Sequence, residues 1–430
     1  MKTLSLIREL VAGFRHFKQE AGLYFFASSV LTKLLSFFTS WLALRLLDNA
    51  ELGRAIFAYQ IIVFVLPFMG LGVGSGLLRY GALKERRMEQ EALFGEVLRK
   101  GFWINCALVL TLWMFSGPLI ERLPGSRQYL HIFSFMLLSS YLAELVKLYA
   151  LVIRKNAYFA FVESTQHVLL VILVFLGALY ADVRGYAWAF VLSPLLAALI
   201  WFPSLGVSLS SLWSLSKGKL LTAEIWRYGL FTSLGNVATQ LLFVVDVLLI
   251  GVLLQNPEKV TAYKYLSLIP FSALFLSQIY MRAHFVELSK EMNNRGFILR
   301  FVKRYHLLFV LLYATFFSIC FVLRKPLLVF FDPSFVVFVD VFLVLCIGVG
   351  GVFVLRGLYG NLLSAMGKSQ WNFYIGLFSL LVNLLFNYLL IPTYGILGAA
   401  ITSAVVMWLS GGLSLLVWAY LSVAVEREKG

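Results

Sequence analysis

Charged side chains are scarce in this 430-residue chain, and that scarcity excludes most classes of protein. Asp, Glu, Lys and Arg make up 13% of the residues and 61% are hydrophobic, whereas a soluble globular protein is about 25% charged. A chain that folds in water cannot hide so much apolar surface behind so few charges. The composition therefore excludes a cytoplasmic enzyme, a secreted disulfide scaffold and a disordered tail, and it predicts an integral membrane protein.

Motifs for metal binding and catalysis are also lacking. The three cysteines lie in apolar runs without CxxC or metal-ligand spacing, and we expect small core residues at all three positions: Cys106, Cys320 and Cys346. The sequence contains no catalytic triad, metal cluster or P-loop, and the glycine-rich stretch at 70–76 does not have the spacing of a dinucleotide fingerprint. We therefore expect a protein that is not an enzyme and that holds no metal and no cofactor.

Long hydrophobic runs dominate what is present. A helix needs about 20 mainly apolar residues to cross a bilayer, and twelve stretches meet that requirement. The predicted spans of this all-α polytopic membrane protein are residues 22–46, 55–78, 101–120, 129–153, 160–181, 186–207, 228–254, 261–281, 305–323, 335–357, 371–391 and 395–422. Residues 1–21 are too charged to span, but their apolar residues recur at helical spacing, which predicts an amphipathic helix at the membrane interface.

The net charge of +15 is best understood through the distribution of Lys and Arg, which mark cytoplasmic loops in membrane proteins. With the N-terminus inside, 25 of the 36 Lys and Arg residues fall in predicted cytoplasmic segments and seven in outer loops. This distribution predicts cytoplasmic termini, and it leaves no reason to expect a nucleic-acid partner. All outer connections are short, so any activity is expected inside the bilayer.

The chain also resembles itself when shifted by about 200 residues. Pro67 and Arg79 meet Pro270 and Arg282, and the two most basic loops, 79–100 and 282–304, correspond. Six spans per half make a parallel repeat, an architecture of transporters whose two lobes enclose a central cavity. We predict an N-lobe at 22–207, a cytoplasmic linker at 208–223, a C-lobe at 224–422 and a cytoplasmic tail at 423–430.

Four stretches resemble polysaccharide flippases of the Wzx type, in the superfamily that includes MATE drug exporters and lipid II flippases. The most specific is the run from Asn387 to Ala400, which is close to an Asn-x-x-Leu-Ile-Pro-x-Tyr-Gly-x-x-Gly-Ala-Ala pattern. The others are Leu44-Arg45-Leu46-Leu47 with Gly53, Gly70-Leu71-Gly72 with Arg79-Tyr80, and Asp246-Val247 with Ile250-Gly251.

This resemblance implies a flippase that moves undecaprenyl-pyrophosphate-linked oligosaccharides to the outer leaflet for O-antigen or exopolysaccharide biosynthesis. It implies a multi-pass protein of the bacterial inner membrane whose partners are the lipid-linked oligosaccharide, membrane lipids and a polysaccharide polymerase. Lipid II flippases resemble fourteen-span proteins, so twelve spans favour an oligosaccharide cargo. Two alternatives stay open. A MATE-like cation-coupled multidrug antiporter keeps the same fold, and a membrane polymerase or ligase is disfavoured because no large outer loop is present.

Ionisable residues inside the spans are the candidate site residues, since they are costly in a membrane and usually face protein or water. Lys33 lies eleven residues into the first span, about 16 Å deep, and is predicted to hold the cargo's pyrophosphate; a buried ion pair is the alternative. Glu144 and Lys147 share one helix face, and they either line the cavity together or simply neutralise each other.

The remaining candidates have more specific expected roles. Glu163 and His167, four residues apart, form either a proton relay or, as we favour, a satisfied interfacial pair. Asp246 in the seventh span is the candidate for binding a coupling ion, H⁺ or Na⁺, as the resemblance implies. Arg79 and Arg282 occupy equivalent positions in the two halves, which predicts that they steer an anionic headgroup at the cytoplasmic mouth.

Overall fold

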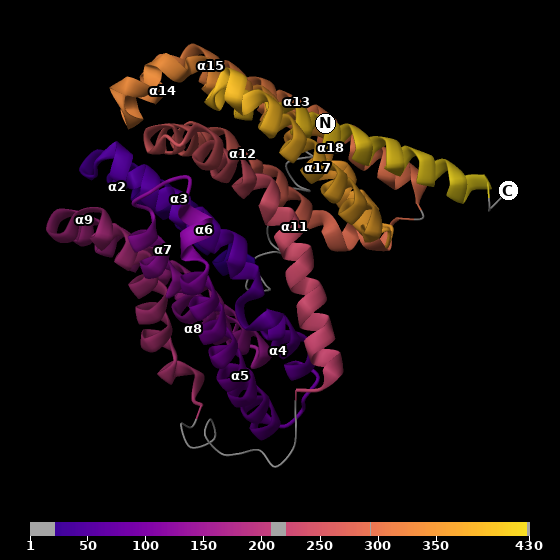
Figure 1. The fold of residues 1–430 in the computed structure, drawn as a ribbon. Helices are drawn as coiled ribbons and strands as arrows, with labels where there is room; N and C mark the ends of the chain where they lie inside the picture. Colours follow the sequence, from indigo (N-terminus) through magenta and orange to yellow (C-terminus); the bar gives the residue numbers. More distant parts are fainter. Residues whose placement is uncertain (1–21, 208–220, 293, 428–430) are drawn as a thin grey trace. The chain divides into compact units, whose positions relative to one another are not determined.

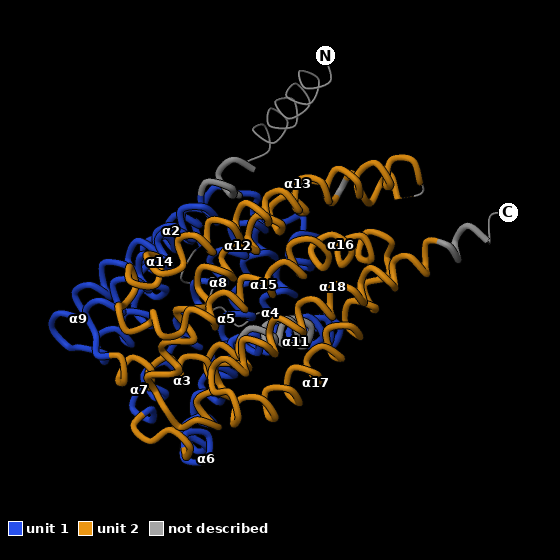
Figure 2. Tube along the Cα trace, turned by 90° about the horizontal axis from the view of Figure 1, so that it is seen from above, with its two compact units in different colours: residues 1–48, 65–120, 126–234 blue, residues 49–64, 121–125, 235–430 orange. Residues whose placement is uncertain are grey.

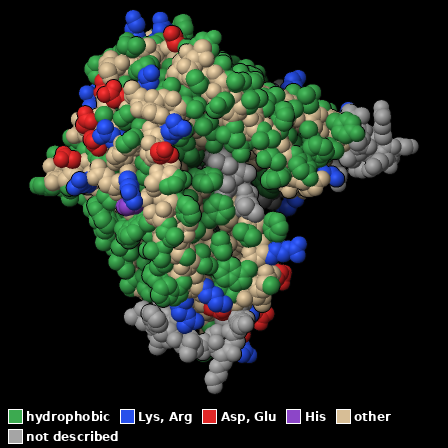
Figure 3. All heavy atoms as spheres, in the orientation of Figure 1, with side chains coloured by type: hydrophobic (Ala, Val, Ile, Leu, Met, Phe, Trp, Pro, Cys, Tyr) green, Lys and Arg blue, Asp and Glu red, His purple; other side chains and the backbone are tan. Residues whose placement is uncertain are grey.

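The computed structural model describes residues 22–207, 221–292 and 294–427. The predicted amphipathic helix at 1–21 and most of the predicted linker lie outside this range. The described part is all helical and contains no strand. Its hydrophobic character continues to the surface, since the face in Figure 3 is covered largely by apolar side chains with charged ones gathered in limited areas.

Contacts within the chain divide it into two compact units, shown in Figure 2. Unit 1 comprises residues 1–48, 65–120 and 126–234, and unit 2 comprises residues 49–64, 121–125 and 235–430. The predicted repeat and the exact borders of the predicted lobes stay predictions.

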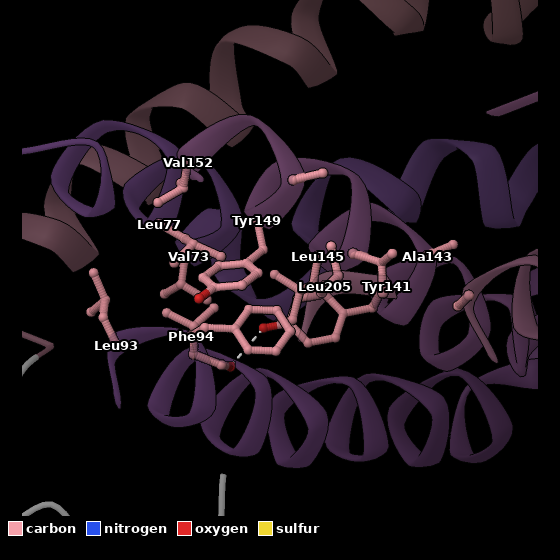
Figure 4. Close-up of a cluster of buried hydrophobic side chains, with 14 of the residues drawn as sticks. Val73, Leu77, Leu93, Phe94, Tyr141, Ala143, Leu145, Tyr149, Val152 and Leu205 are labelled. Carbon is pink, nitrogen blue, oxygen red and sulfur yellow. Dashed lines mark hydrogen bonds between the residues drawn. The ribbon is translucent and has the colours of Figure 1, made fainter. Parts of the chain in front are cut away.

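Unit 1 contains most of the helices from the first half of the chain (Figure 2). In chain order (Figure 1), they are α2 (Gly22–Leu46), the 3₁₀ helix η1 (Leu66–Gly72), α4 (Val73–Gly81), α5 (Arg87–Met114), α6 (Ser116–Ile120), α7 (Arg127–Ser134), α8 (Met136–Val152), α9 (Asn156–Trp201), η2 (Pro203–Leu205) and the start of α11 (Ala223–Leu254). Their core includes Phe94 and Tyr149, whose ring centroids lie 4.6 Å apart, and Tyr141, whose hydroxyl donates to the Val97 carbonyl at 2.7 Å (Figure 4).

Unit 2 contains nearly all of α3 and the rest of the second half. Its helices are α3 (Asn49–Val65), the remainder of α11, α12 (Pro257–Lys290), α13 (Arg295–Val322), α14 (Arg324–Phe331), η3 (Pro333–Phe338), α15 (Val339–Gly350), the π-helical turn η4 (Gly351–Arg356), α16 (Gly357–Ala365), α17 (Ser369–Tyr394) and α18 (Ile396–Arg427). Aromatic packing builds the core, where the Tyr305 and Phe309 rings stack at 4.1 Å.

Within the part of the chain that the structure describes, nine helical stretches are long and apolar enough to cross a membrane. They are Asn49–Gly81, Arg87–Met114, Arg127–Val152, Ala157–Leu205, Pro257–Met281, Arg295–Val322, Pro333–Ala365, Ser369–Tyr394 and Ile396–Ser422. Of the predicted spans that these do not cover, 22–46 coincides with α2 and 228–254 lies within α11. The protein is therefore a multi-pass membrane protein, while the count of twelve and the orientation of the termini stay predictions.

The stretch Ala157–Leu205 covers two predicted spans, 160–181 and 186–207. Helical backbone angles are lost at Ala181 and Asp182, at the boundary that the sequence predicted. Gly177 and Gly185 lie so close that a Cβ on Gly185 would stand 2.1 Å from the Gly177 carbonyl oxygen. Two glycines therefore allow the chain to turn back tightly between the two halves of α9.

A second break interrupts the helical stretch Asn49–Gly81. Pro67 lies in this region, where the structure has a 3₁₀ turn beginning at Leu66 and a loss of helical geometry at Met69, Gly70 and Leu71. The backbone N–H of Gly70 donates to Asn105 Oδ1 at 3.0 Å, which satisfies a group that the break frees. Irregular backbone inside a membrane span is tolerated where such partners replace helical hydrogen bonds.

Candidate functional site

Unit 1 brings together five of the ionisable residues that the sequence singled out. The lysine cluster comprises Lys33 on α2, Glu144 and Lys147 on α8, and Glu163 and His167 on α9. The Lys147 ammonium lies 2.8 Å from a Glu144 carboxylate oxygen and 2.6 Å from Glu163 Oε2. The Lys147 side chain is 12% exposed and that of Glu144 is 41% exposed, so the pair extends from the interior to the surface of the unit.

Lys147 thus compensates two carboxylates. The pairing of Glu144 with Lys147, one of the two alternatives for these residues, is present, and the pairing of Lys147 with Glu163 was not foreseen. Glu163 also lies within electrostatic range of Lys33 and His167. His167 Nδ1 lies 2.9 Å from the backbone oxygen of Glu163, a contact within one helical turn. Because this contact is with the backbone and not with the carboxylate, the proton relay and the satisfied pair both stay predictions.

Lys33 is exposed on α2. Ser29 lies four residues before Lys33, and Ser36 and Ser40 lie three and seven residues after it, so all four residues share one face of the helix. The Ser36 and Ser40 hydroxyls donate to backbone oxygens one turn earlier. The neighbouring Ser28 hydroxyl donates to the Ala160 carbonyl at 3.1 Å and lies 3.0 Å from Ser164 Oγ, so it links α2 to α9. This face of α2 therefore combines a cation with hydroxyl groups, which suits an anionic or sugar-bearing ligand.

Arg79 is exposed on α4, and its guanidinium lies 4.7 Å from the Tyr228 ring centroid and 5.6 Å from that of Tyr80. The Tyr80 hydroxyl donates to Glu224 at 2.9 Å, and it thereby connects α4 with the start of α11. Arg282 belongs to α12, but its side chain lies outside those that the structure describes. The proposed equivalence of the two arginines stays a prediction.

Unit 2 contains the aspartate cluster, which consists of Asp246 on α11, Tyr263 on α12, Asn383 and Asn387 on α17, and Ser403 on α18. Asp246 Oδ1 accepts from Asn387 Nδ2 at 2.7 Å and from Asn383 Nδ2 at 3.0 Å. Its other oxygen accepts from the Tyr263 hydroxyl at 2.9 Å and from the Ser403 hydroxyl. Four neutral donors from three helices therefore converge on one carboxylate.

The aspartate cluster is buried, with 1% of Asp246 exposed. Among the described residues, no Lys, Arg or His forms an ion pair with Asp246. The Oδ1 atom of Asn387 is buried and has no hydrogen-bond donor in the described structure. Because a buried carboxylate requires charge compensation, this set of oxygen atoms is chemically suited to a proton or a small hard cation.

Sequence reasoning singled out Asp246 but not the groups that bind it. Asn383 and Asn387 are four residues apart in an apolar helix, a spacing that places two amides on one face. The sequence indicated Asn387 only as part of the Asn-x-x-Leu-Ile-Pro run. The pair of amides on one face of a membrane helix was the feature that could have indicated a polar site. No sequence feature pointed to Tyr263 or Ser403.

No family model and no curated protein matches the chain in sequence. Solved structures do match its fold. A multidrug resistance MATE family transporter of the MOP superfamily, in an inward-facing conformation, superimposes with a TM-score of 0.77 at 11% identity, over 93% of this chain and 96% of that one.

The lipid II flippase MurJ, in an inward closed conformation, gives a TM-score of 0.71 at 15% identity, over 92% of this chain and 87% of that one. A MOP superfamily transporter from Pyrococcus furiosus gives 0.63 at 12% identity, over 95% of each chain. These similarities establish that the chain has the fold of MOP superfamily transporters. The matched proteins are transporters and flippases, and at these identities the likeness concerns the fold alone.

Proposed function

We propose that this protein moves an undecaprenyl-pyrophosphate-linked oligosaccharide from the cytoplasmic to the outer leaflet of a bacterial inner membrane by alternating access. The supporting observation is the set of polar groups on unit 1. Lys147 compensates Glu144 and Glu163, and Lys33 is an exposed cation on a face of α2 that also carries serine hydroxyls. A surface of this kind favours a phosphate with attached sugars over an organic cation.

The fold is compatible with such a cargo, since the matched structures include a lipid II flippase. Lipid-linked oligosaccharides share with lipid II a polar group that must cross the bilayer interior. In this proposal Lys33 binds the pyrophosphate, Lys147 and Glu144 contact phosphate or sugar, and Arg79 and Arg282 guide the headgroup towards the site.

The decisive experiment is mass spectrometry of lipid-linked sugars in a deletion strain, combined with an assay for the leaflet in which they accumulate. We expect a complete oligosaccharide repeat on its lipid carrier, trapped in the inner leaflet, and release of this block by the wild-type gene. A normal pool of lipid-linked sugars on both sides would contradict the flippase assignment.

We further propose that Asp246 binds the coupling cation. Burial without a cationic partner and the unpartnered Asn387 Oδ1 support this role. Protonation and Na⁺ binding each neutralise the carboxylate, and transport by the purified protein in liposomes under separate Na⁺ and pH gradients distinguishes them. A transport rate independent of both gradients would contradict the role of Asp246 in coupling.

A cation-coupled multidrug antiporter is the second candidate, because a MATE family transporter shares the fold at a TM-score of 0.77. Glu144, 41% exposed, would then be the carboxylate that attracts a cationic drug. New sensitivity of the deletion strain to cationic drugs, with a normal lipid-sugar pool, would favour this candidate over the flippase.

A further inference from the structure

A partly buried arginine in unit 2 is surrounded by neutral groups. Arg356 ends the π-helical turn η4, and its Nη1 donates to Asn372 Oδ1 at 3.1 Å and to Ser414 Oγ at 2.5 Å. Its Nη2 donates to the Asn372 backbone carbonyl at 3.4 Å. Among the side chains that the structure describes, no carboxylate lies within ion-pair distance of this guanidinium. A guanidinium stays charged in proteins. The positive charge of Arg356 must therefore be balanced by a group other than these side chains.

The neutral partners are themselves fixed. The Asn372 amide donates to the Gly360 carbonyl at 2.7 Å and to the Ser364 hydroxyl at 2.9 Å. The Ser414 hydroxyl donates to the Ser410 carbonyl at 2.7 Å, and Ser414 is fully buried. Three helices, α16, α17 and α18, therefore orient Arg356 without neutralising it. Three contacts account for only part of a guanidinium's five N–H donors.

The arginine site lies close to a helix end. Asn372 is the fourth residue of α17, which begins at Ser369 without a side-chain cap and follows the exposed Lys368. At 1.5 Å per residue, Asn372 is within about 6 Å of that end. The uncapped N–H groups of a helix N-terminus favour an anion. Trp371 and Tyr374, whose rings meet at 6.0 Å, are residue types that concentrate where membrane meets water.

Glycines shape the surroundings of the guanidinium. A Cβ on Gly360 would stand 3.4 Å from Asn372 Oδ1 and 3.7 Å from Arg356 Cζ, so the missing side chain leaves room beside the arginine. A Cβ on Gly411 would stand 2.6 Å from the Gly351 carbonyl oxygen, and its absence allows α18 to approach the π-helical turn. Small residues therefore surround the guanidinium of Arg356, and they let the neighbouring helices pack closely around it.

We infer that Arg356, with Asn372 and the N-terminus of α17, binds a phosphate group at the depth of lipid headgroups. Guanidinium is the side chain best matched to phosphate oxygens, and basic pockets between membrane helices bind anionic headgroups. Two sources carry this chemistry: an anionic phospholipid of the membrane, and the pyrophosphate of a lipid-linked cargo. The inference does not rest on the proposed transport function, because a phospholipid site would serve a drug transporter equally.

The test is native mass spectrometry of the purified full-length protein in detergent, titrated separately with phosphatidylglycerol, phosphatidylcholine and undecaprenyl pyrophosphate. We expect the wild type to retain phosphatidylglycerol or undecaprenyl pyrophosphate roughly tenfold more strongly than Arg356→Gln does, as the loss of charge-assisted hydrogen bonds implies. Arg324→Gln is the matched control, since Arg324 is a unit 2 arginine whose hydrogen bond goes to the Phe321 carbonyl. It should retain both lipids like the wild type.

A second variant separates binding from folding. Gly360→Leu fills the space beside the guanidinium and keeps the charge, so it should weaken the same lipid contact, with thermal unfolding of each variant reporting on the fold. Loss of phosphatidylglycerol alone assigns the site to a phospholipid, and loss of undecaprenyl pyrophosphate alone assigns it to the carrier. Equal retention of both lipids by the wild type and Arg356→Gln would overturn the inference.

Discussion

The amide of Asn387 donates a hydrogen bond to the carboxylate of Asp246 at 2.7 Å, across 141 residues of sequence. Asn383, one helical turn earlier, donates to the same oxygen at 3.0 Å. Two amides on one face of α17 thus bind the carboxylate of Asp246 on α11. Because these donors are neutral, they stabilise the position of the carboxylate without cancelling its charge, and this is the basis of the proposal that Asp246 binds the coupling cation.

Asp246→Asn should therefore abolish coupling while keeping the fold. An asparagine oxygen can still accept from Asn383 and Asn387, and its amide can donate to the hydroxyls of Tyr263 and Ser403. We expect gradient-driven transport in liposomes to fall roughly tenfold or more, which corresponds to about 1.4 kcal/mol. Asp340→Asn, at an exposed position in the first turn of α15, is the matched control and should transport normally. Wild-type gradient dependence in Asp246→Asn would rule out this site as the coupling centre.

Lys33→Ala should abolish export of the lipid-linked oligosaccharide while the protein remains in the membrane. The reason is that Lys33 is the exposed cation of the lysine cluster, and its removal deletes the expected phosphate contact. The measurement is the amount of trapped repeat unit in a deletion strain that carries the variant, with membrane abundance determined by immunoblot. Lys84→Ala is the control, because Lys84 pairs with Glu89 at 3.6 Å on an exposed surface. Near-normal export by Lys33→Ala would eliminate it as the pyrophosphate ligand.

The sequence predicts helices well where a single apolar run decides the outcome. The span 22–46 coincides with α2, and the boundary after residue 181 coincides with the break in α9. The break at Met69–Leu71 could not be predicted in detail, because its backbone depends on Asn105, a residue of another helix. Pro67 lies beside this break, but the contact with another helix determines the backbone geometry there.

In the candidate site, likewise, contacts between residues close in sequence could be predicted, and contacts between different helices could not. Glu144 and Lys147 are three residues apart, so their pairing follows from helical spacing. The contact of Lys147 with Glu163 requires α8 and α9 to pack in one particular register, which no local pattern encodes. For the same reason Asp246 could be identified as a costly charge, while Tyr263 and Ser403 could not be identified as its partners.

Lys147→Met should destabilise unit 1, because it leaves Glu144 and Glu163 without their shared cation. Breaking a buried ion pair costs about 3–5 kcal/mol and a surface pair at most about 1 kcal/mol, so for this partly exposed cluster we expect on the order of 2 kcal/mol. The measurement is thermal unfolding of the purified protein in detergent. The triple variant with Glu144→Gln and Glu163→Gln should recover most of the loss. Failure of that rescue would show that Lys147 acts mainly through packing.

Gly72→Ala should destabilise the protein more than an ordinary helical glycine substitution does. Gly72 has a φ of +74°, and a Cβ there would stand 2.1 Å from the carbonyl oxygen of Gly229 on α11. Both the left-handed backbone and this close approach therefore exclude a side chain. Gly376→Ala on α17 is the control: a Cβ at Gly376 meets nothing within 4 Å, and alanine is favoured over glycine in a helix by about 1 kcal/mol. We expect a lower unfolding temperature for Gly72→Ala and an equal or higher one for Gly376→Ala. Equal unfolding temperatures for Gly72→Ala and the wild type would mean that α4 and α11 can separate at no cost, and the close approach would then not hold the break in place.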